Sequence, residues 1–345
     1  MRTFHYSILV TILCLGIASY WGYNNAGVSG IWPALSLVTI LGIMEVSLSF
    51  DNAVVNAAVL KEMDAKWRQL FLTVGILIAV FGMRLVFPIL IVAVAIDQGM
   101  LEVAKLAISQ PEVYSEHLHA SHTAIAAFGG TFLLMVFLSF LFDESRKLHW
   151  LGKIEEKLAK LGKIDSIAII VSLLVLIGLR EYLPIEEAQR STMFLAGVGG
   201  VVLYVIVDSL GSFFETEDED HTIALTAKRS GAMGFIYLEI LDASFSFDGV
   251  IGAFAITRDV VIIMLGLAIG AMFVRSTTVY LVEEGTLDQY VFLEHGAHYA
   301  IGVLALIMLY SIYQEVPELF TGLIGVAFIV AAVFSSLAHK KKREG

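Results

Sequence analysis

A single cysteine, Cys14, occurs in the 345 residues of the chain, which excludes an intrachain disulfide and a metal site built on cysteine. Charged residues are also scarce: they make up 16% of the chain, against about a quarter in ordinary soluble domains. The net charge of −11 comes without a basic patch or a recognition motif, so the sequence argues against nucleic acid as a partner.

Apolar residues, by contrast, are abundant, at 58% of the chain with a mean hydropathy of +0.81. They fall in runs near the length of about 20 residues that a helix needs to cross a bilayer. The sequence therefore predicts an all-α polytopic membrane protein, surrounded by lipid, with about ten transmembrane helices. The ten apolar segments cover residues 7–22, 33–59, 69–95, 122–142, 165–182, 193–214, 231–256, 259–281, 297–314 and 318–338.

The basic residues predict the orientation of these segments. Lysines and arginines follow the second segment (Lys61, Arg68), the fourth (Arg146, Lys163) and the tenth, which ends in "HKKKREG". By the positive-inside rule both termini are cytoplasmic, which agrees with an even number of spans, since that places both termini on the same side. We expect the first segment to be a retained helix, because no clear cleavage site follows it.

Two segments between the spans stand out. Residues 144–164 carry leucines and isoleucines at three- and four-residue steps, which predicts an amphipathic helix with a basic face on the cytoplasmic membrane surface. The acidic run "ETEDED" at 215–220 is typical of a solvated loop.

The second apolar segment contains an unexpected group of polar residues, in the stretch "IMEVSLSFDNAVVNAAVL" from 43 to 60. Glu45 and Asp51 are six residues apart, so on a regular helix they point about 120° away from each other. Both can face one ligand only if the helix breaks between them. Asp51 and Asn52 form a suitable N-cap for a second half-helix, which predicts such a break.

This stretch has a counterpart later in the chain. "EVSLSFDN" at 45–52 aligns without gaps to "DASFSFDG" at 242–249, and the next span carries an arginine in each copy, Arg84 and Arg275. The span after that opens with "HASHTAI" in the first copy and "HGAHYAI" in the second. Three ordered matches indicate an internal duplication.

An odd number of spans separates the copies, so we expect two inverted-topology repeats with a polar site between them, as in secondary transporters. The first repeat covers residues 1–190, with core helices at about 33–142, and the second covers 191–345, with core helices at about 231–314.

The polar residues of the two copies form a set of oxygen ligands. Such a set favours Mg²⁺, Mn²⁺ or Ca²⁺ over Zn²⁺ or Cu⁺. The candidate metal ligands are Glu45, Asp51, Asn52, Glu239, Asp242 and Asp248. The candidate supporting or proton-relay residues are Arg84, Arg275, Ser49, Ser246, His122 and His298. Two alternatives stay open: the arginines pair with the acids in a structural network, or the acids act as a pure proton relay.

The histidines lie in pairs at the start of two spans, His119 with His122 and His295 with His298. Each pair occupies one helical face and could bind a cation or relay protons. The alternative is that these imidazoles only anchor the helix ends. For Glu239, the spacing of three residues from Asp242 predicts that both carboxylates share one face.

The motif "E-x-S-L-S-F-D-N", repeated as "D-x-S-F-S-F-D-G", resembles the TerC family of integral membrane proteins, in particular a bacterial branch described mainly as a domain of unknown function. The resemblance implies Mn²⁺ export across the bacterial inner membrane by a multi-pass protein. It implies site roles for Glu45, Asp51, Asn52, Asp242 and Asp248. Asp242 stands where the family pattern has Glu, and Gly249 stands where the first copy has Asn52.

From these observations we expect a divalent-cation transporter and not an enzyme. Mn²⁺ efflux by alternating access is the favoured activity, with Mg²⁺ or Ca²⁺ as other substrates and protons as a counter-ion. Two other classes stay open. One is a membrane scaffold or stress-resistance complex component. The other is an intramembrane aspartyl hydrolase using Asp51 and Asp248, although the G-x-G-D signature of such proteases is absent.

Overall fold

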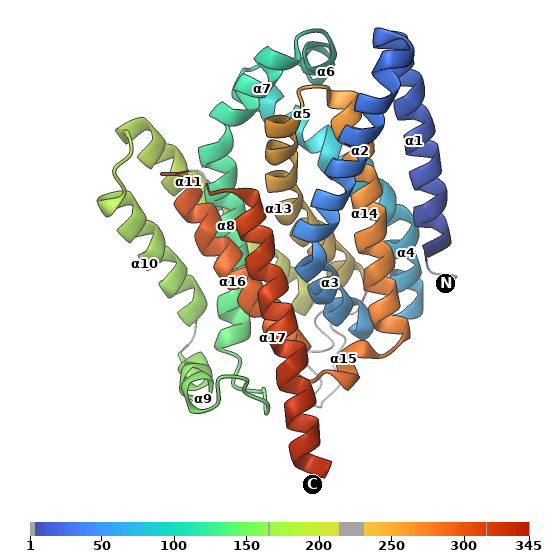
Figure 1. Cartoon of the computed structure of the whole chain (residues 1–345). Coiled ribbons are helices and arrows are strands. Elements are labelled where there is room, and N and C mark those ends of the chain that lie inside the picture. Colours follow the sequence, from blue (N-terminus) through green and yellow to red (C-terminus); the bar gives the residue numbers. More distant parts are fainter. Residues whose placement is uncertain (1–3, 165, 214–230, 315, 345) are drawn as a thin grey trace. The chain divides into compact units, whose positions relative to one another are not determined.

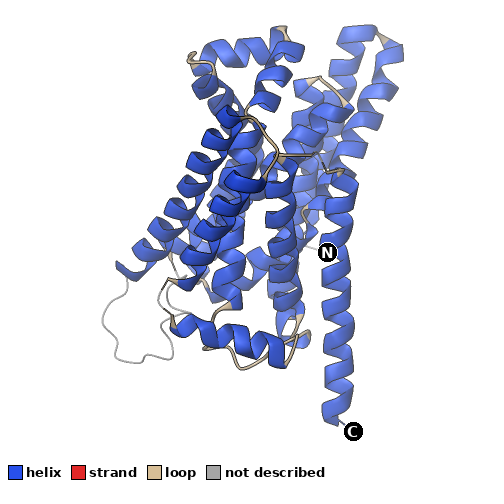
Figure 2. Cartoon of the chain, turned by 90° about the vertical axis from the view of Figure 1, so that its left-hand side faces the viewer, coloured by secondary structure: helices blue, strands red, loops and turns tan. Residues whose placement is uncertain are grey.

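The computed structural model describes residues 4–164, 166–213, 231–314 and 316–344 (Figure 1). Every regular element in these ranges is a helix, which confirms the all-α prediction (Figure 2). The chain forms two compact units, Met1–Ser121 with Ser230–Gly285 and His122–Arg229 with Thr286–Gly345. The acidic run at 215–220 lies outside the described residues.

Unit 1 contains the helices that carry both copies of the acidic motif. The first copy lies at the junction of α2 and α3, and the second lies within α13 (Figure 1). The elements of unit 1 are α1 (His5–Ala26), α2 (Val28–Leu48), α3 (Phe50–Glu62), α4 (Ala65–Leu77), the π-helix η2 (Ile78–Val86), α5 (Phe87–Ala95), α6 (Met100–Ser109), α7 (Pro111–Ala120), α13 (Ala232–Ile256) and α14 (Val260–Glu283).

Unit 2 contains α8, which begins at His122, and α16, which contains both His295 and His298. These two helices pack against each other. The elements of unit 2 are α8 (His122–Leu141), α9 (Lys153–Ala159), the 3₁₀ turn η3 (Lys160–Lys163), α10 (Ile167–Tyr182), α11 (Glu187–Phe213), α15 (Thr286–Gln289), α16 (Leu293–Ser311) and α17 (Glu318–Glu344).

Eight helices of the described chain are long and apolar enough to cross a membrane, which supports a multi-pass membrane protein. Two of the ten expected spans are not among them, for different reasons. Helix α10 has 16 residues, shorter than a typical span. Helix α13 is long enough, with 25 residues, but three carboxylates interrupt its apolar sequence.

Helix α14 is the buried helix of unit 1, and α1, α2 and η2 pack around it. Gly266 lets α2 approach closely, because a Cβ atom at this position would lie 2.5 Å from the Cβ of Leu41. Ser7 of α1 donates its hydroxyl to the Met272 carbonyl of α14 at 2.8 Å. Small residues and interhelical hydrogen bonds of this kind hold helices together where the lipid offers no hydrophobic driving force.

Helix α8 has the same role in unit 2, where α10, α11 and α16 pack against it. The Thr131 hydroxyl donates to the Gly197 carbonyl of α11 at 2.8 Å. A Cβ atom at Gly302 would lie 2.7 Å from the ring of Phe137, so α16 also needs a small residue where it meets α8. Helices such as α1 and α17 instead expose large apolar side chains, as expected for surfaces that face lipid.

Each compact unit takes helices from both predicted sequence repeats. In unit 1, α2 of the first copy packs on α14 of the second, and α13 of the second copy packs on η2 of the first. The boundary near residue 190 therefore does not coincide with a boundary between the units. The inverted relationship of the repeats stays a prediction.

The amphipathic helix expected over 144–164 is shorter in the structure. Only Lys153–Ala159 is α-helical, with one 3₁₀ turn after it, and residues 144–152 form turns and irregular chain. Glu155 explains the difference, because its buried carboxylate accepts hydrogen bonds from Arg146 and from the Leu151 backbone, each at 3.0 Å. These two bonds fold the preceding segment back onto the helix.

Candidate functional site

The helix that carries the first acidic motif is interrupted at Ser49, between Glu45 and Asp51. Helix α2 ends at Leu48 and α3 begins at Phe50, while Ser49 has φ −105° and ψ 17°. The interruption is limited to this one residue, because the Ser49 backbone N–H still donates to the Glu45 carbonyl at 3.0 Å and that of Ala53 donates to the Ser49 carbonyl at 3.3 Å. It lies two residues before the predicted Asp51–Asn52 cap, and no side chain caps α3. In the second copy, α13 runs without interruption through 242–249, so the two copies differ in backbone.

Glu45 is buried at this interruption, with 1% of its surface exposed. Its carboxylate forms an ion pair with Arg84 and accepts a hydrogen bond from the Ser49 hydroxyl at 3.2 Å. Ser49 therefore bonds the carboxylate one turn earlier instead of capping α3. The hydrogen bond between Ser49 and Glu45 thus lies at the interruption of the helix and holds the carboxylate there.

Arg84 lies in the π-helix η2. Its Nη1 donates to the Ala79 carbonyl, five residues earlier, at 2.6 Å. The π-helix is rare in proteins and often occurs at functional sites. The π-helix presents the guanidinium group of Arg84 to Glu45 and satisfies one of its other donors.

The two described acids of the second copy, Glu239 and Asp242, share a single arginine. Nη2 of Arg275 donates to Glu239 at 3.2 Å and to Asp242 at 3.1 Å, and the two acids are each 6% exposed. This confirms that Glu239 and Asp242 occupy one face of α13. Nη1 of Arg275 donates to the Phe71 carbonyl at 3.1 Å, and its guanidinium carbon lies 3.9 Å from the centre of the Phe71 ring.

Glycines create the space that these acids occupy. A Cβ atom at Gly249 would lie 2.7 Å from Oε2 of Glu45, and one at Gly270 would overlap the Cβ and Cγ of Glu45. A Cβ atom at Gly75 would lie 2.6 Å from Oε1 of Glu239. The second copy has Gly249 at the position where the first copy has Asn52. The physical reason is that the Glu45 side chain occupies the space that a side chain at position 249 would need.

Replacing Gly270 with alanine is expected to destabilise the chain by about 1–3 kcal/mol, because the new methyl group must displace Glu45 in a closely packed interior. Thermal unfolding of the purified protein measures the effect. Gly16→Ala is the matched control: nothing lies within 4 Å of its added Cβ, and alanine in a helix is favoured over glycine by about 1 kcal/mol. Equal melting temperatures for the two variants would contradict the prediction.

Two amide side chains of α3 are also buried. Asn52 and Asn56 are 3% and 1% exposed, and the Oδ1 atom of each is buried with no hydrogen-bond partner in the described part of the chain. They are four residues apart and therefore occupy the same face of α3. A buried acceptor without a partner costs about 1–3 kcal/mol, so two of them on one face need an explanation.

The remaining candidate residues have separate positions. Asp51 and Asp248 lie in α3 and α13, but their side chains are outside the described part of the structure. Ser246 is buried in α13. His122 and His298 belong to unit 2, where His298 stacks on Phe140 with ring centres 3.9 Å apart. These two histidines therefore belong to a different compact unit from the three described acids.

Among the described side chains, no three of His, Cys, Asp and Glu are arranged to hold a metal ion together. The three described acids instead contact arginines, which is the pairing that the sequence left open as an alternative. Asn56 was not among the predicted ligands, although its spacing from Asn52 in the sequence places it on the same helical face. Gly249, which shapes the site, has no side chain that could indicate its role in the sequence.

The model of one protein family, described as "Protein of unknown function (DUF475)", matches residues 50–343 of the chain. That range includes both arginines, α13 and the two asparagines of α3. Neither the curated proteins nor the solved structures include a match.

Proposed function

Because the chain belongs to the DUF475 family, whose description assigns no activity, we propose its function from the buried polar groups of unit 1. The chain is a membrane transporter of divalent cations. The groups that support this are three acids, two arginines and two amides, all on helices of one compact unit.

The observation that carries the proposal is an excess of buried oxygen acceptors over buried cationic groups. Glu45, Glu239 and Asp242 contribute three carboxylates, and Arg84 and Arg275 contribute two guanidinium groups, which leaves one negative charge within this group of five side chains. An uncompensated charge inside a membrane costs several kcal/mol. A bound cation or a proton supplies the missing charge.

The unpaired amide oxygens make a metal cation a better match than a proton alone. The Oδ1 atoms of Asn52 and Asn56 cannot be protonated at ordinary pH, but they are suitable ligands for a hard divalent cation. Amide and carboxylate oxygens suit Mn²⁺, Mg²⁺ and Ca²⁺. The resemblance to the TerC family favours Mn²⁺ as the substrate, exported from the cytoplasm of a bacterium across its inner membrane.

In this mechanism the arginines hold the carboxylates in the absence of substrate. Arg275 is shared between Glu239 and Asp242, so one of these two acids can leave it without becoming unpaired, provided that a cation takes its place. Protons that exchange with the cation on the same carboxylates would keep the net charge of the membrane interior constant. The interruption of the helix at Ser49 gives the chain a place to bend during alternating access.

The test is transport by the purified chain in liposomes that contain a fluorescent indicator of divalent cations. We expect Mn²⁺ uptake above that of empty liposomes, and a fall of at least about tenfold, or about 1.4 kcal/mol, for Glu239→Gln, which removes the excess charge. Glu102→Gln on the exposed face of α6 is the control and should transport normally. The proposal is refuted if liposomes that contain the wild-type protein take up no divalent cation faster than empty liposomes do.

A further inference from the structure

Helix α9 and the turn η3 of unit 2 expose apolar side chains that no described part of the protein covers. Ile154 is 66% exposed, and Leu161 is exposed as well. These two residues are seven positions apart, close to two helical turns, so they share one face. Leu151 and Ile164 flank them and are also exposed. Together these four side chains form the apolar patch of α9.

A different face of α9 is fixed to the rest of unit 2. Glu155 and Ala159 are buried and lie four residues apart, one turn of the helix. The Glu155 carboxylate, already bonded to Arg146, lies 3.4 Å from Nε2 of His295 in α16. The guanidinium carbon of Arg146 lies 3.7 Å from the centre of the Phe140 ring in α8. These contacts hold α9 in one orientation and leave its apolar patch uncovered.

The direction of α9 places this patch along a membrane surface. The chain bends by 101° between Lys153–Lys163 and α10, and Figure 1 shows α9 below the ends of α8 and α10. Helix α8 is long and apolar enough to cross a membrane. Helix α10, which packs on it, exposes Ile170, Leu174 and Ile177 on one face, as expected for a surface that faces lipid. Because α9 runs across the ends of these helices, it lies at the edge of the apolar layer.

Lysines lie beside the patch on the remaining face of the segment. The exposed lysines are Lys153, Lys157, Lys160 and Lys163. Lys160 pairs with Glu156, with Nζ 2.8 Å from Oε1. The other three form no ion pair within the described part of the chain. Figure 1 shows the C-terminal end of α17, with the exposed Lys340 and Lys341, at the same end of unit 2.

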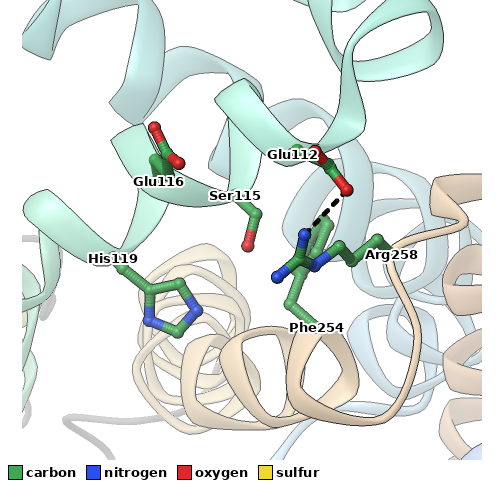
Figure 3. Close-up of a pocket in the computed structure, with 6 residues that line it drawn as sticks. All are labelled: Glu112, Ser115, Glu116, His119, Phe254 and Arg258. Carbon is green, nitrogen blue, oxygen red and sulfur yellow. Dashed lines mark hydrogen bonds and ion pairs between the residues drawn. The ribbon is translucent and has the colours of Figure 1, made fainter.

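An exposed cation in unit 1 shows the contrast. Nη1 of Arg258 lies 2.9 Å from Oε1 of Glu112, and Figure 3 shows the two side chains directed toward each other. The charge of Arg258 is thus neutralised within the protein. The charges of Lys153, Lys157 and Lys163 instead remain available to an external anion, next to apolar side chains.

We propose that the α9 segment, residues 151–164, binds anionic phospholipids of the membrane that surrounds the protein. Its apolar patch enters the boundary between headgroups and acyl chains, and its lysines contact the phosphate groups. An amphipathic helix with lysines beside an apolar face binds membrane interfaces in this way. The apolar patch alone would fit any lipid, so the lysines make the surface selective for lipids with a net negative charge.

This surface goes beyond the transport proposal and does not depend on it. It belongs to unit 2, whereas the transport proposal depends on α2, α3, α13 and α14 of unit 1. A protein that binds anionic lipid at α9 and moves no cation would refute transport alone.

The position of the patch is tested with nitroxide labels on the full-length protein in nanodiscs of phosphatidylcholine and phosphatidylglycerol. Cys14→Ala in the background leaves the introduced cysteine as the only one. We expect a label at Ile154→Cys to collide mainly with oxygen, which concentrates in lipid. A label at Glu156→Cys, on another face of the same helix, should collide mainly with a water-soluble nickel complex. Equal exposure of both labels to nickel would place the patch in water and overturn the proposal.

The selectivity is tested by native mass spectrometry of the full-length protein in detergent, titrated with phosphatidylglycerol or with phosphatidylcholine of the same acyl chains. Each lysine near an anionic surface contributes about fivefold in affinity. We therefore expect Lys157→Gln to weaken the tightest class of phosphatidylglycerol site by about fivefold. The triple variant Lys153→Gln/Lys157→Gln/Lys163→Gln should weaken it by at least about tenfold. Arg258→Gln is the control, because it changes the net charge by the same amount as Lys157→Gln but lies in unit 1.

Three results of this titration contradict the proposal. One is wild-type affinity for phosphatidylglycerol in the triple variant, and another is an equal loss in Arg258→Gln and Lys157→Gln. The third is displacement of the lipid by an equal concentration of inorganic phosphate, which would show that the lysines bind the phosphate ion and not the lipid. The lysines are exposed, so their replacement leaves the fold intact, and the label at position 154 tests the patch with all of them present.

Discussion

Replacing Arg275 with methionine is expected to destabilise the chain by about 3–5 kcal/mol, the usual effect of removing one partner from a buried ion pair. The physical reason is that Glu239 and Asp242, each 6% exposed, lose the only cationic group that contacts them in the described structure. Phe71 also loses the guanidinium group that lies 3.9 Å from its ring. Thermal or chemical unfolding of the purified protein in detergent measures the change.

Two further variants show whether charge is the cause. Arg84→Met leaves one buried carboxylate, Glu45, without its partner, so we expect a smaller loss than for Arg275→Met. Adding Glu239→Gln and Asp242→Asn to Arg275→Met should restore most of the stability, because neutral side chains of the same shape need no cation. If Arg275→Met unfolds no more easily than the wild type, the pairing of the acids with Arg275 does not stabilise the protein.

The sequence was a sufficient guide to the features that depend on periodicity and charge. Long apolar runs predicted the helices, and the three-residue spacing of Glu239 and Asp242 predicted their common face. The match of Arg84 with Arg275 indicated that both copies carry a cationic partner for their acids. These features follow from local spacing, which a single sequence displays directly.

The features that the sequence did not predict depend on contacts between distant segments. At the interruption, the Ser49 hydroxyl donates to the carboxylate of Glu45 at 3.2 Å, and the same carboxylate is paired with Arg84, 39 positions later in the chain. The π-helix around Arg84 leaves no signature in the pattern of apolar residues. The role of Gly249 depends on the Glu45 side chain, more than 200 positions earlier in the chain.

The transport proposal makes its sharpest prediction at the two asparagines of α3. The double variant Asn52→Leu/Asn56→Leu is expected to bind Mn²⁺ at the membrane site at least about 100-fold more weakly, since two ligands are lost at roughly tenfold each. The same variant should be at least as stable as the wild type without metal, because leucine removes two buried acceptors that have no partner and cost about 1–3 kcal/mol each.

The opposite effects on Mn²⁺ binding and on stability distinguish a metal ligand from a residue with only a structural role. If Asn52 and Asn56 only held helices together, their replacement would lower the melting temperature and would not change its dependence on Mn²⁺. If they are ligands, Mn²⁺ at 100 times its dissociation constant should stabilise the wild type by about 2.7 kcal/mol and the double variant far less. Asn25→Leu, the same substitution at an exposed position of α1, controls for the effect of the leucine side chain. A double variant that melts earlier and still responds to Mn²⁺ like the wild type would rule out the two amides as ligands.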